Sequence, residues 1–318
     1  MKIRIISVIL LVVIIFGVIP ATVGCSKRDD GKITVICTVF PVYDWVRNVV
    51  GSSETVEVKL LVSNGADLHS FQPSADDIIA IRDAEMIVRV GGAADAFLND
   101  ILPECDEIKD VCLMSAPGVT VRESLKETHS HAEGDGHAHA ADEHIWLSLK
   151  NAKAAVSAIC ETLCELDGEN AEKYRANTEA YAERLSSLDA EYTAATATAK
   201  NKKIIFADRF PFIYMTEEYG IEHTAAFEGC STESDASFDT VMRLSSKLDT
   251  WGLDYIAVTE SSDGQLAEAV INASGRKNAQ ILVFDSMQSV TDADISAGKS
   301  YMEIMKNNLQ TLKIAVGE

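Results

Sequence analysis

A stretch of thirty residues without glycine or proline constrains the fold more than any other part of this sequence. It covers residues 170–199 and is rich in alanine, glutamate and leucine. Apolar and aromatic side chains recur along it at steps of three and four, which is the spacing of one helix face. These side chains are Tyr174, Thr178, Tyr181, Leu185, Leu188, Tyr192 and Ala195. The sequence therefore predicts one helix, about 45 Å long.

Two segments on either side of this helix resemble each other. Residues 33–51 and 203–220 each contain a β-branched apolar run, then Phe-Pro, a helix-like stretch and a glycine. Proline near a helix start and glycine at its end predict a strand, a turn and a helix in that order. This repetition favours a helix that connects two lobes over an amphipathic helix within one domain.

Strand-like runs alternate with helical patterns along the rest of the chain. The strand-like runs are residues 56–62, 86–90, 255–258 and 281–284, and the helical patterns include 75–82 and 238–248. Such alternation indicates parallel sheets. We therefore predict an α/β fold with two lobes, whose parallel sheets are flanked by helices and joined by one long backbone helix. The predicted boundaries are 32–168 for the N-terminal lobe, 169–199 for the linking helix and 200–318 for the C-terminal lobe.

The first residues have the pattern of a secretory signal. Two basic residues precede a short apolar run over 5–19, and small residues lead to Cys25. A run this short indicates a cleaved signal, with a plain membrane anchor as the alternative. The site resembles a bacterial lipobox, which implies a lipid on Cys25. We expect a signal peptide at 1–24, a tether at 25–31, and an extracytoplasmic protein anchored by lipid to the bacterial cell membrane.

The chain is strongly acidic. It has 28 Lys and Arg against 49 Asp and Glu, a formal net charge of −21 at pH 7. Nucleic-acid binding needs a basic surface, so nucleic acid is excluded as a partner. An acidic surface suits a protein that handles cations, although it also serves solubility.

The cysteines show neither CxxC nor zinc-ribbon spacing. Cys105 and Cys112 flank an acidic stretch and would pair in an oxidising compartment, or else stay as thiols. Cys160 and Cys164 are four residues apart and would share a helix face.

Five of the seven histidines lie between residues 129 and 144. Their small and acidic neighbours cannot build a core, so we predict a mobile loop over 127–144. Imidazoles beside carboxylates attract metal ions, so we expect the loop to gather metal at low affinity. The histidines of its interior are His129, His131, His137 and His139.

Three histidines stand apart from the loop interior. His69 follows a strand and a glycine-containing turn, which places it at a strand end, where open α/β sheets bind ligands. His144 closes the loop, just before an ordered-looking segment. His223 is expected to begin a strand and to be structural.

The sequence resembles the solute-binding lipoproteins of ABC transporters for zinc or manganese. The likeness extends from about residue 32 to the C-terminus. The motifs that carry it are residues 38–44, 65–74, the histidine-rich loop, 143–148, 208–212 and 301–309. The resemblance implies two α/β lobes on one long helix, a monomer without enzymatic activity, and an ABC permease in the membrane as partner.

The resemblance also implies a metal site, from which one family ligand is missing. His69 and His144 match the first two family histidines, and Asp285 matches the carboxylate after a late strand. Ala207 stands where the family has its third histidine. Asp208, next to it, is the favoured replacement. The alternatives are Cys230, Glu233 and a loop histidine.

Two imidazoles with one or two carboxylates form a site that Zn²⁺ accepts in tetrahedral geometry. Mn²⁺, the alternative together with Fe²⁺, favours more oxygen ligands. In the family the histidine-rich loop accompanies zinc import, so the resemblance implies Zn²⁺. Glu260 ends another predicted strand and is expected to support the ligands rather than bind metal. Because the histidines must be neutral, binding should weaken below a pH of about 6.

Two other functions compete with metal capture. An extracellular zinc hydrolase needs an open metal position and a general base, but the sequence has no HExxH or GxSxG motif. A surface adhesin would use the same scaffold for contact alone. We therefore predict capture of Zn²⁺ and its delivery to the permease.

Overall fold

The computed structural model describes residues 31–62, 71–124, 141–227 and 236–318. Lys32–Glu318 forms one compact unit. Several predicted features lie outside the described residues. These are the signal peptide with Cys25, His69, the interior loop histidines His129, His131, His137 and His139, and the alternative ligands Cys230 and Glu233.

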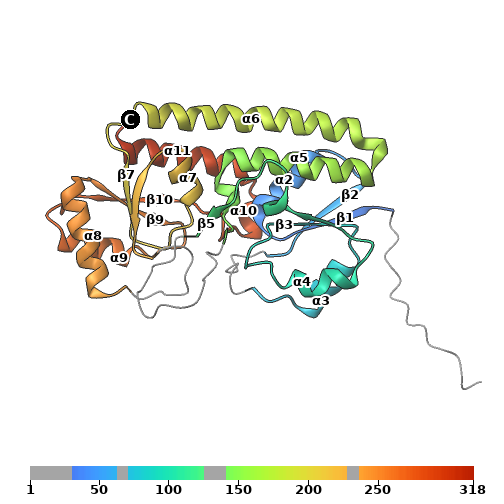
Figure 1. The fold of residues 1–318 in the computed structure, drawn as a ribbon, viewed down its shortest axis with the longest axis horizontal. Coiled ribbons are helices and arrows are strands. Elements are labelled where there is room, and N and C mark those ends of the chain that lie inside the picture. Colours follow the sequence, from blue (N-terminus) through green and yellow to red (C-terminus); the bar gives the residue numbers. More distant parts are fainter. Residues whose placement is uncertain (1–30, 63–70, 125–140, 228–235) are drawn as a thin grey trace, which may run out of the picture. The chain divides into compact units, whose positions relative to one another are not determined.

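Four parallel strands form the first sheet, in the order β2-β1-β3-β4 (Figure 1). The strands are β1 (Ile33–Cys37), β2 (Val56–Leu60), β3 (Met86–Arg89) and β4 (Lys109–Cys112). Helix α2 (Phe40–Val50) packs on one face of the sheet. Helices α3 (Ala75–Arg82) and α4 (Leu98–Ile101) cover the other face, where Ile81 and Leu98 pack against Ile36 and Ile87.

The second sheet repeats this topology. Its strands are β7 (Lys203–Phe206), β8 (Glu222–Ala225), β9 (Tyr255–Thr259) and β10 (Gln280–Phe284), all parallel in the order β10-β9-β7-β8. When the strands of each sheet are numbered along the chain, both sheets have the order second, first, third, fourth from one edge to the other. Helices α8 (Phe238–Trp251) and α9 (Gln265–Ala273) cover one face, and α7 (Ile213–Glu218) and α11 (Tyr301–Val316) pack on the other. The repeated sequence pattern thus corresponds to a repeated α/β fold.

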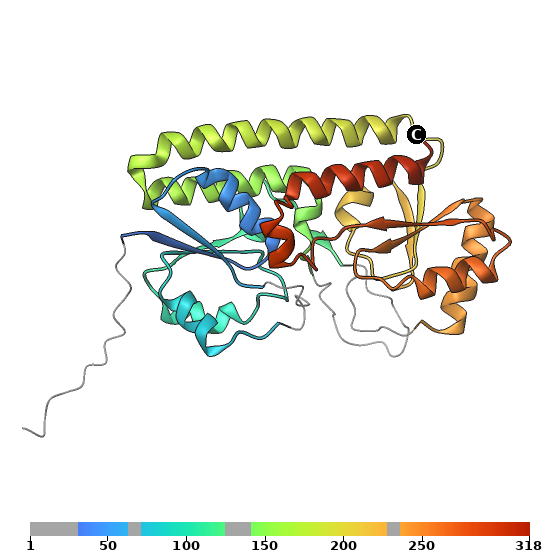
Figure 2. The ribbon, with the colours of Figure 1, turned by 180° about the vertical axis from the view of Figure 1, so that it is seen from behind.

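One long helix, α6 (Ala171–Ala197), lies along both sheets (Figures 1 and 2). All seven side chains of the predicted stripe are buried on it. Helix α5 (Leu149–Leu166) packs along its first half and α11 along its second, which the sequence did not predict. A single hydrophobic core therefore continues from the first sheet to the second through these helices. The lobe boundaries themselves stay predictions.

Short elements complete the fold. They are α10 (Asp292–Ser296), the two-stranded antiparallel pair β5 (Arg122–Glu123) and β6 (Ala141–Asp142), and the 3₁₀ turns Leu102–Glu104, Leu113–Ser115, Ile145–Leu147 and Gly168–Asn170. Across residues 31–62, 71–124, 141–227 and 236–318, no helix has both the length and the apolar character needed to cross a bilayer.

The two Phe-Pro segments both show the predicted order of strand, turn and helix, but the helix begins at a different place in each. Phe40 and Pro41 begin α2, as expected. In the second sheet, α7 begins only at Ile213 and is shorter than predicted. The rings of Phe210 and Phe212 lie 5.1 and 5.2 Å from that of Phe206, so the residues on either side of Pro211 pack in the core before α7 begins.

The pairing of Cys105 with Cys112 is not formed, and both are free thiols. The sulfur of Cys105 donates back to the carbonyl of Ile101 at 3.4 Å. The sulfur of Cys112, at the end of β4, lies 3.7 Å from Ser115 Oγ. Each thiol is thus engaged within its own turn.

Asp44 joins three helices at a buried point. Its Oδ2 accepts from the backbone N–H of Tyr301 on α11 at 3.3 Å and from Tyr181 on α6 at 3.5 Å. Only 8% of Asp44 is exposed. Burial raises the pKa of Asp44 to about 6, although Arg47 and Arg184 act in the opposite direction. The ionised carboxylate therefore costs stability at neutral pH.

Asp44→Asn should stabilise the protein at neutral pH. The folded carboxyl holds its proton more tightly than the unfolded one, so the associated stability is present below a pH of about 4 and lost as the pH rises through about 6. Asparagine removes that loss, so we expect a gain on the order of 2 kcal/mol at about pH 7.5 and almost none at about pH 4. Urea unfolding of the wild type and the variant measures the gain at each pH. An equal gain at the two pH values would contradict a raised pKa of Asp44.

Candidate metal centre

Both sheets place an acidic side chain where the strand order reverses. In the first sheet, Asp95 accepts from Thr38 Oγ1 at 3.5 Å and from the N–H of Gly91 at 3.1 Å. In the second, Asp208 follows β7 and its Oδ2 accepts from the N–H and Oγ1 of Thr259 on β9, at 3.0 and 2.6 Å. Open α/β sheets bind ligands at this position, beyond the carboxyl ends of the strands.

His144 is buried and oriented by a carboxylate. Its Nδ1 lies 2.9 Å from Asp142 Oδ1, and its backbone N–H donates to the same oxygen at 2.9 Å. Only 2% of His144 is exposed. A carboxylate on one ring nitrogen fixes the tautomer and the ring orientation of a metal-binding histidine, and ligation then falls to Nε2.

The segment before His144 is held firmly, although it was predicted to belong to the mobile loop. Residues 141–142 form β6, which pairs with β5. The hydroxyl of Tyr214 donates to the carbonyl of Asp142 at 2.6 Å, and Asp142 and Glu143 are both buried. Residues 141–144 are therefore part of the folded scaffold.

Trp146 connects the segment of His144 to the loop that contains Asp285 through a hydrogen bond. Its Nε1 donates to the carbonyl of Ser286 at 2.9 Å, and its own carbonyl accepts from the hydroxyl of Tyr301 at 2.6 Å. The rings of His144 and Trp146 meet edge to face, 5.2 Å apart. His144 thus lies where the two sheets meet, next to a strand-end loop of the second.

Asp285 follows β10 and is positioned by three neighbours. Its backbone N–H and carbonyl form reciprocal 2.8 Å hydrogen bonds with the side-chain amide of Asn308. Its Oδ1 accepts from the N–H of Met287 at 2.8 Å, and its Oδ2 lies 3.2 Å from Lys299 Nζ. The carboxylate is 19% exposed, so a cation can reach it but must compete with this ammonium group.

Asp208 and Glu260 accept several hydrogen bonds from the protein. Besides its bonds from Thr259, Asp208 accepts the N–H of Arg209 at 2.8 Å. Glu260 accepts from both the N–H and the Oγ of Ser286, at 2.8 and 2.9 Å, and from Ser289 Oγ at 3.1 Å. Glu260 therefore shapes the loop that follows Asp285.

His223 and Ala207, the two other positions considered in the sequence, pack or hydrogen-bond within the second sheet. His223 lies in β8 and stacks on Phe210 with ring centroids 4.0 Å apart, and burial lowers its pKa. Ala207 is buried and its N–H donates to the carbonyl of Ala257 at 2.8 Å, so its side chain offers no ligand. Within the described ranges, no three or more His, Cys, Asp or Glu side chains are grouped so that they could hold a metal ion. His144, Asp208 and Asp285 are thus not gathered into such a group, and His69 lies outside these ranges.

Sequence reasoning missed Asp142 and Asp95. An acidic residue two positions before a candidate histidine was a usable signal for Asp142. Asp95 carried no such signal, because only the fold brings it to Thr38 and Gly91.

Two parallel sheets of equal order, joined by a long helix and with an oriented histidine between them, define a two-lobed binding protein. Residues 35–315 match the family described as "Zinc-uptake complex component A periplasmic", and the chain belongs to that family.

Relatives of known name agree with this membership. The chain is 28% identical over 296 residues to "Zinc-binding protein AdcA" of Streptococcus pyogenes serotype M3, covering 90% of this chain and 56% of that protein. It is 30% identical over 297 residues to "Zinc-binding lipoprotein AdcA" of Streptococcus pneumoniae R6, covering 92% and 58%. The chain thus spans little more than half the length of these relatives.

A solved structure shows the same fold. The Zn(II)-bound ZnuA-like domain of Streptococcus pneumoniae AdcA superimposes with a TM-score of 0.73 at 25% identity, covering 91% of this chain and all of that domain.

Proposed function

We propose that this protein captures Zn²⁺ outside the cytoplasm and hands it to an ABC permease, with no bond of a substrate made or broken. One observation carries the proposal: a buried histidine, oriented by Asp142, lies at the meeting of two sheets of a zinc-uptake family fold. The names of the relatives, which describe zinc-binding proteins, support the choice of metal.

The proposed ligands are His69, His144 and Asp285, with Asp208 as the fourth. Cys230 and Glu233 remain the alternatives for that fourth position. Two imidazoles and carboxylate oxygens suit Zn²⁺ in a tetrahedral site. The Asp208 carboxylate would bind through lone pairs not used by Thr259 and Arg209. Manganese would ask for more oxygen ligands than this set contains.

The N-terminal sequence supports a lipid anchor on Cys25, and one relative is named a lipoprotein. We propose a monomer tethered to the outer face of the cell membrane, with the histidine-rich loop gathering metal at low affinity. The permease would then receive zinc from a protein held close to it.

Metal titration of a loop-deleted chain tests this function. Residues 128–140 are removed, and the deletion ends before β6 because Asp142 orients His144. We expect the same number of tightly bound Zn²⁺ ions per chain, at least one, with and without the loop, and weaker Mn²⁺ binding in calorimetry. Loss of tight zinc binding in the deleted chain, or a preference for Mn²⁺, would contradict the proposal.

Lys299→Met should strengthen zinc binding. The ammonium group, 3.2 Å from Asp285 Oδ2, competes with the metal for that oxygen. Removing it should tighten binding about 3- to 10-fold at low ionic strength, and less in high salt. Competition with a chromogenic zinc chelator measures the change. Lys306→Met, on the exposed side of α11, is the matched control, and equal affinities for the two variants would argue against Asp285 as a ligand.

A further inference from the structure

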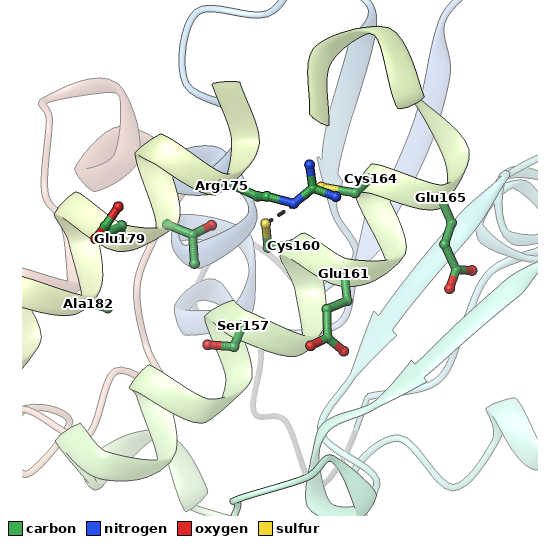
Figure 3. Close-up of a pocket in the computed structure, with 9 residues that line it drawn as sticks. Ser157, Cys160, Glu161, Cys164, Glu165, Arg175, Glu179 and Ala182 are labelled. Carbon is green, nitrogen blue, oxygen red and sulfur yellow. Dashed lines mark hydrogen bonds between the residues drawn. The ribbon is translucent and has the colours of Figure 1, made fainter. Parts of the chain in front are cut away.

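A groove of about 630 Å³ lies between α5 and α6 (Figure 3). It is separate from the described residues considered above for zinc capture, because the described residues that line it belong to these two helices. Cys160 and Cys164 project into it from successive turns of α5, with their sulfur atoms 3.8 Å apart. Cys160 is 6% exposed and Cys164 somewhat more, so the pair is sheltered yet open to the groove.

The helix keeps these two thiols from forming a disulfide with each other. Residues four apart on a helix have Cβ atoms about 5–6 Å apart. A disulfide needs Cβ atoms about 3.5–4.5 Å apart. A disulfide between Cys160 and Cys164 would therefore require unwinding a turn of α5, which is continuous from Leu149 to Leu166.

The distance between the two sulfur atoms suits an ion that binds to both of them. In a tetrahedral site with Zn–S bonds of about 2.3 Å, two sulfur ligands lie about 3.8 Å apart. The sulfur atoms of Cys160 and Cys164 already have this separation.

The rest of the groove favours a hydrated cation. The carboxylates of Glu161 and Glu179 line it, as does the guanidinium of Arg175, whose charge acts on Cys164 and favours its thiolate (Figure 3). Glu165 also lines it, but its carboxylate is 3.2 Å from Lys109 Nζ. The hydroxyl of Thr178 is buried and has no hydrogen-bond partner among the residues that the structure describes. It would accept or donate a hydrogen bond to a water molecule on the ion.

We propose that Cys160 and Cys164 form a second metal site, for a tetrahedral, sulfur-binding divalent cation such as Zn²⁺ or Cd²⁺. Each thiol releases one proton to solvent as its sulfur binds, so the two thiolates neutralise the charge of the ion. Water completes the coordination, because the described residues supply no third ligand.

Cadmium titration of the freshly reduced full-length chain tests this site. Thiolate ligands give an ultraviolet charge-transfer band that nitrogen and oxygen ligands do not give. Every chain titrated also carries Cys230→Ser, because Cys230 is an alternative ligand for zinc capture and would otherwise contribute to the band. We expect the band to saturate when one Cd²⁺ per chain is bound by thiolates, and to disappear in Cys160→Ser/Cys164→Ser. The control Cys105→Ser/Cys112→Ser removes two other free thiols and should keep the band.

Mass spectrometry after alkylation gives a second readout that needs no variant. Bound Cd²⁺ should protect Cys160 and Cys164 from iodoacetamide, and a chelator should restore their labelling. The proposal is overturned if the band survives in Cys160→Ser/Cys164→Ser, or if the reduced wild-type chain shows neither band nor protection. Either result would leave zinc capture by the histidine site untouched.

Discussion

His144→Ala should weaken zinc binding by at least about 100-fold, because loss of a ligand costs more than the 10–100-fold typical for its hydrogen-bonded partner. The imidazole is fixed by Asp142 before any metal arrives, so little ordering is needed on binding. Alanine removes the proposed nitrogen ligand, and the neighbouring Trp146 cannot replace it, because its Nε1 donates to the carbonyl of Ser286 and its ring meets that of His144 edge to face. Chelator competition with the loop-deleted chain measures the affinity without the loop histidines.

A graded pair of variants separates ligation from structural damage. Asp142→Asn keeps the shape but weakens the hydrogen bond to Nδ1, and should cost about 10–100-fold. His223→Ala removes another partly buried ring, stacked on Phe210, and should leave zinc affinity unchanged. If His144→Ala and His223→Ala bind zinc equally well, His144 is not a ligand.

Local patterns predicted the fold because each was complete within a short segment. The α6 stripe needs only the 3.6-residue period, and every residue of it is buried. The pairing of α5 with α6 was missed because it depends on a contact between helices. The later start of α7 was missed for the same reason, because Phe212 packs against Phe206 and against Phe284, which is distant in sequence.

The site was predictable only as far as residue types and strand ends allow. His144 and Asp285 follow from motif likeness, and the structure places them in adjoining segments joined through Trp146 and Ser286. The ion pair of Asp285 with Lys299 could not be foreseen, since it depends on how the loop before α11 folds back. The hydrogen bonds from Thr259 to Asp208 could not be foreseen either, because they depend on the pairing of β7 with β9.

Trp146→Ala should destabilise the protein by about 3–5 kcal/mol, the range for truncating a large buried aromatic side chain. The indole is 1% exposed and belongs to the core shared by both sheets. Its loss leaves a cavity and also leaves the carbonyl of Ser286 without the Nε1 donor. Since Ser286 follows Asp285, the damage should extend to the proposed metal site as well as to stability.

Two further substitutions separate packing from hydrogen bonding. Trp146→Phe keeps most of the ring and removes the N–H, so about 1–3 kcal/mol should be lost, the cost of one unsatisfied buried acceptor. Phe238→Ala, at a side chain that is 77% exposed, should change stability by less than about 0.5 kcal/mol. Urea unfolding compares the three variants. A loss below about 1 kcal/mol for Trp146→Ala would mean that the sheets do not depend on this contact to stay together. In that case the position of His144 relative to Asp285 must be set by the long helices, and zinc affinity should survive the substitution.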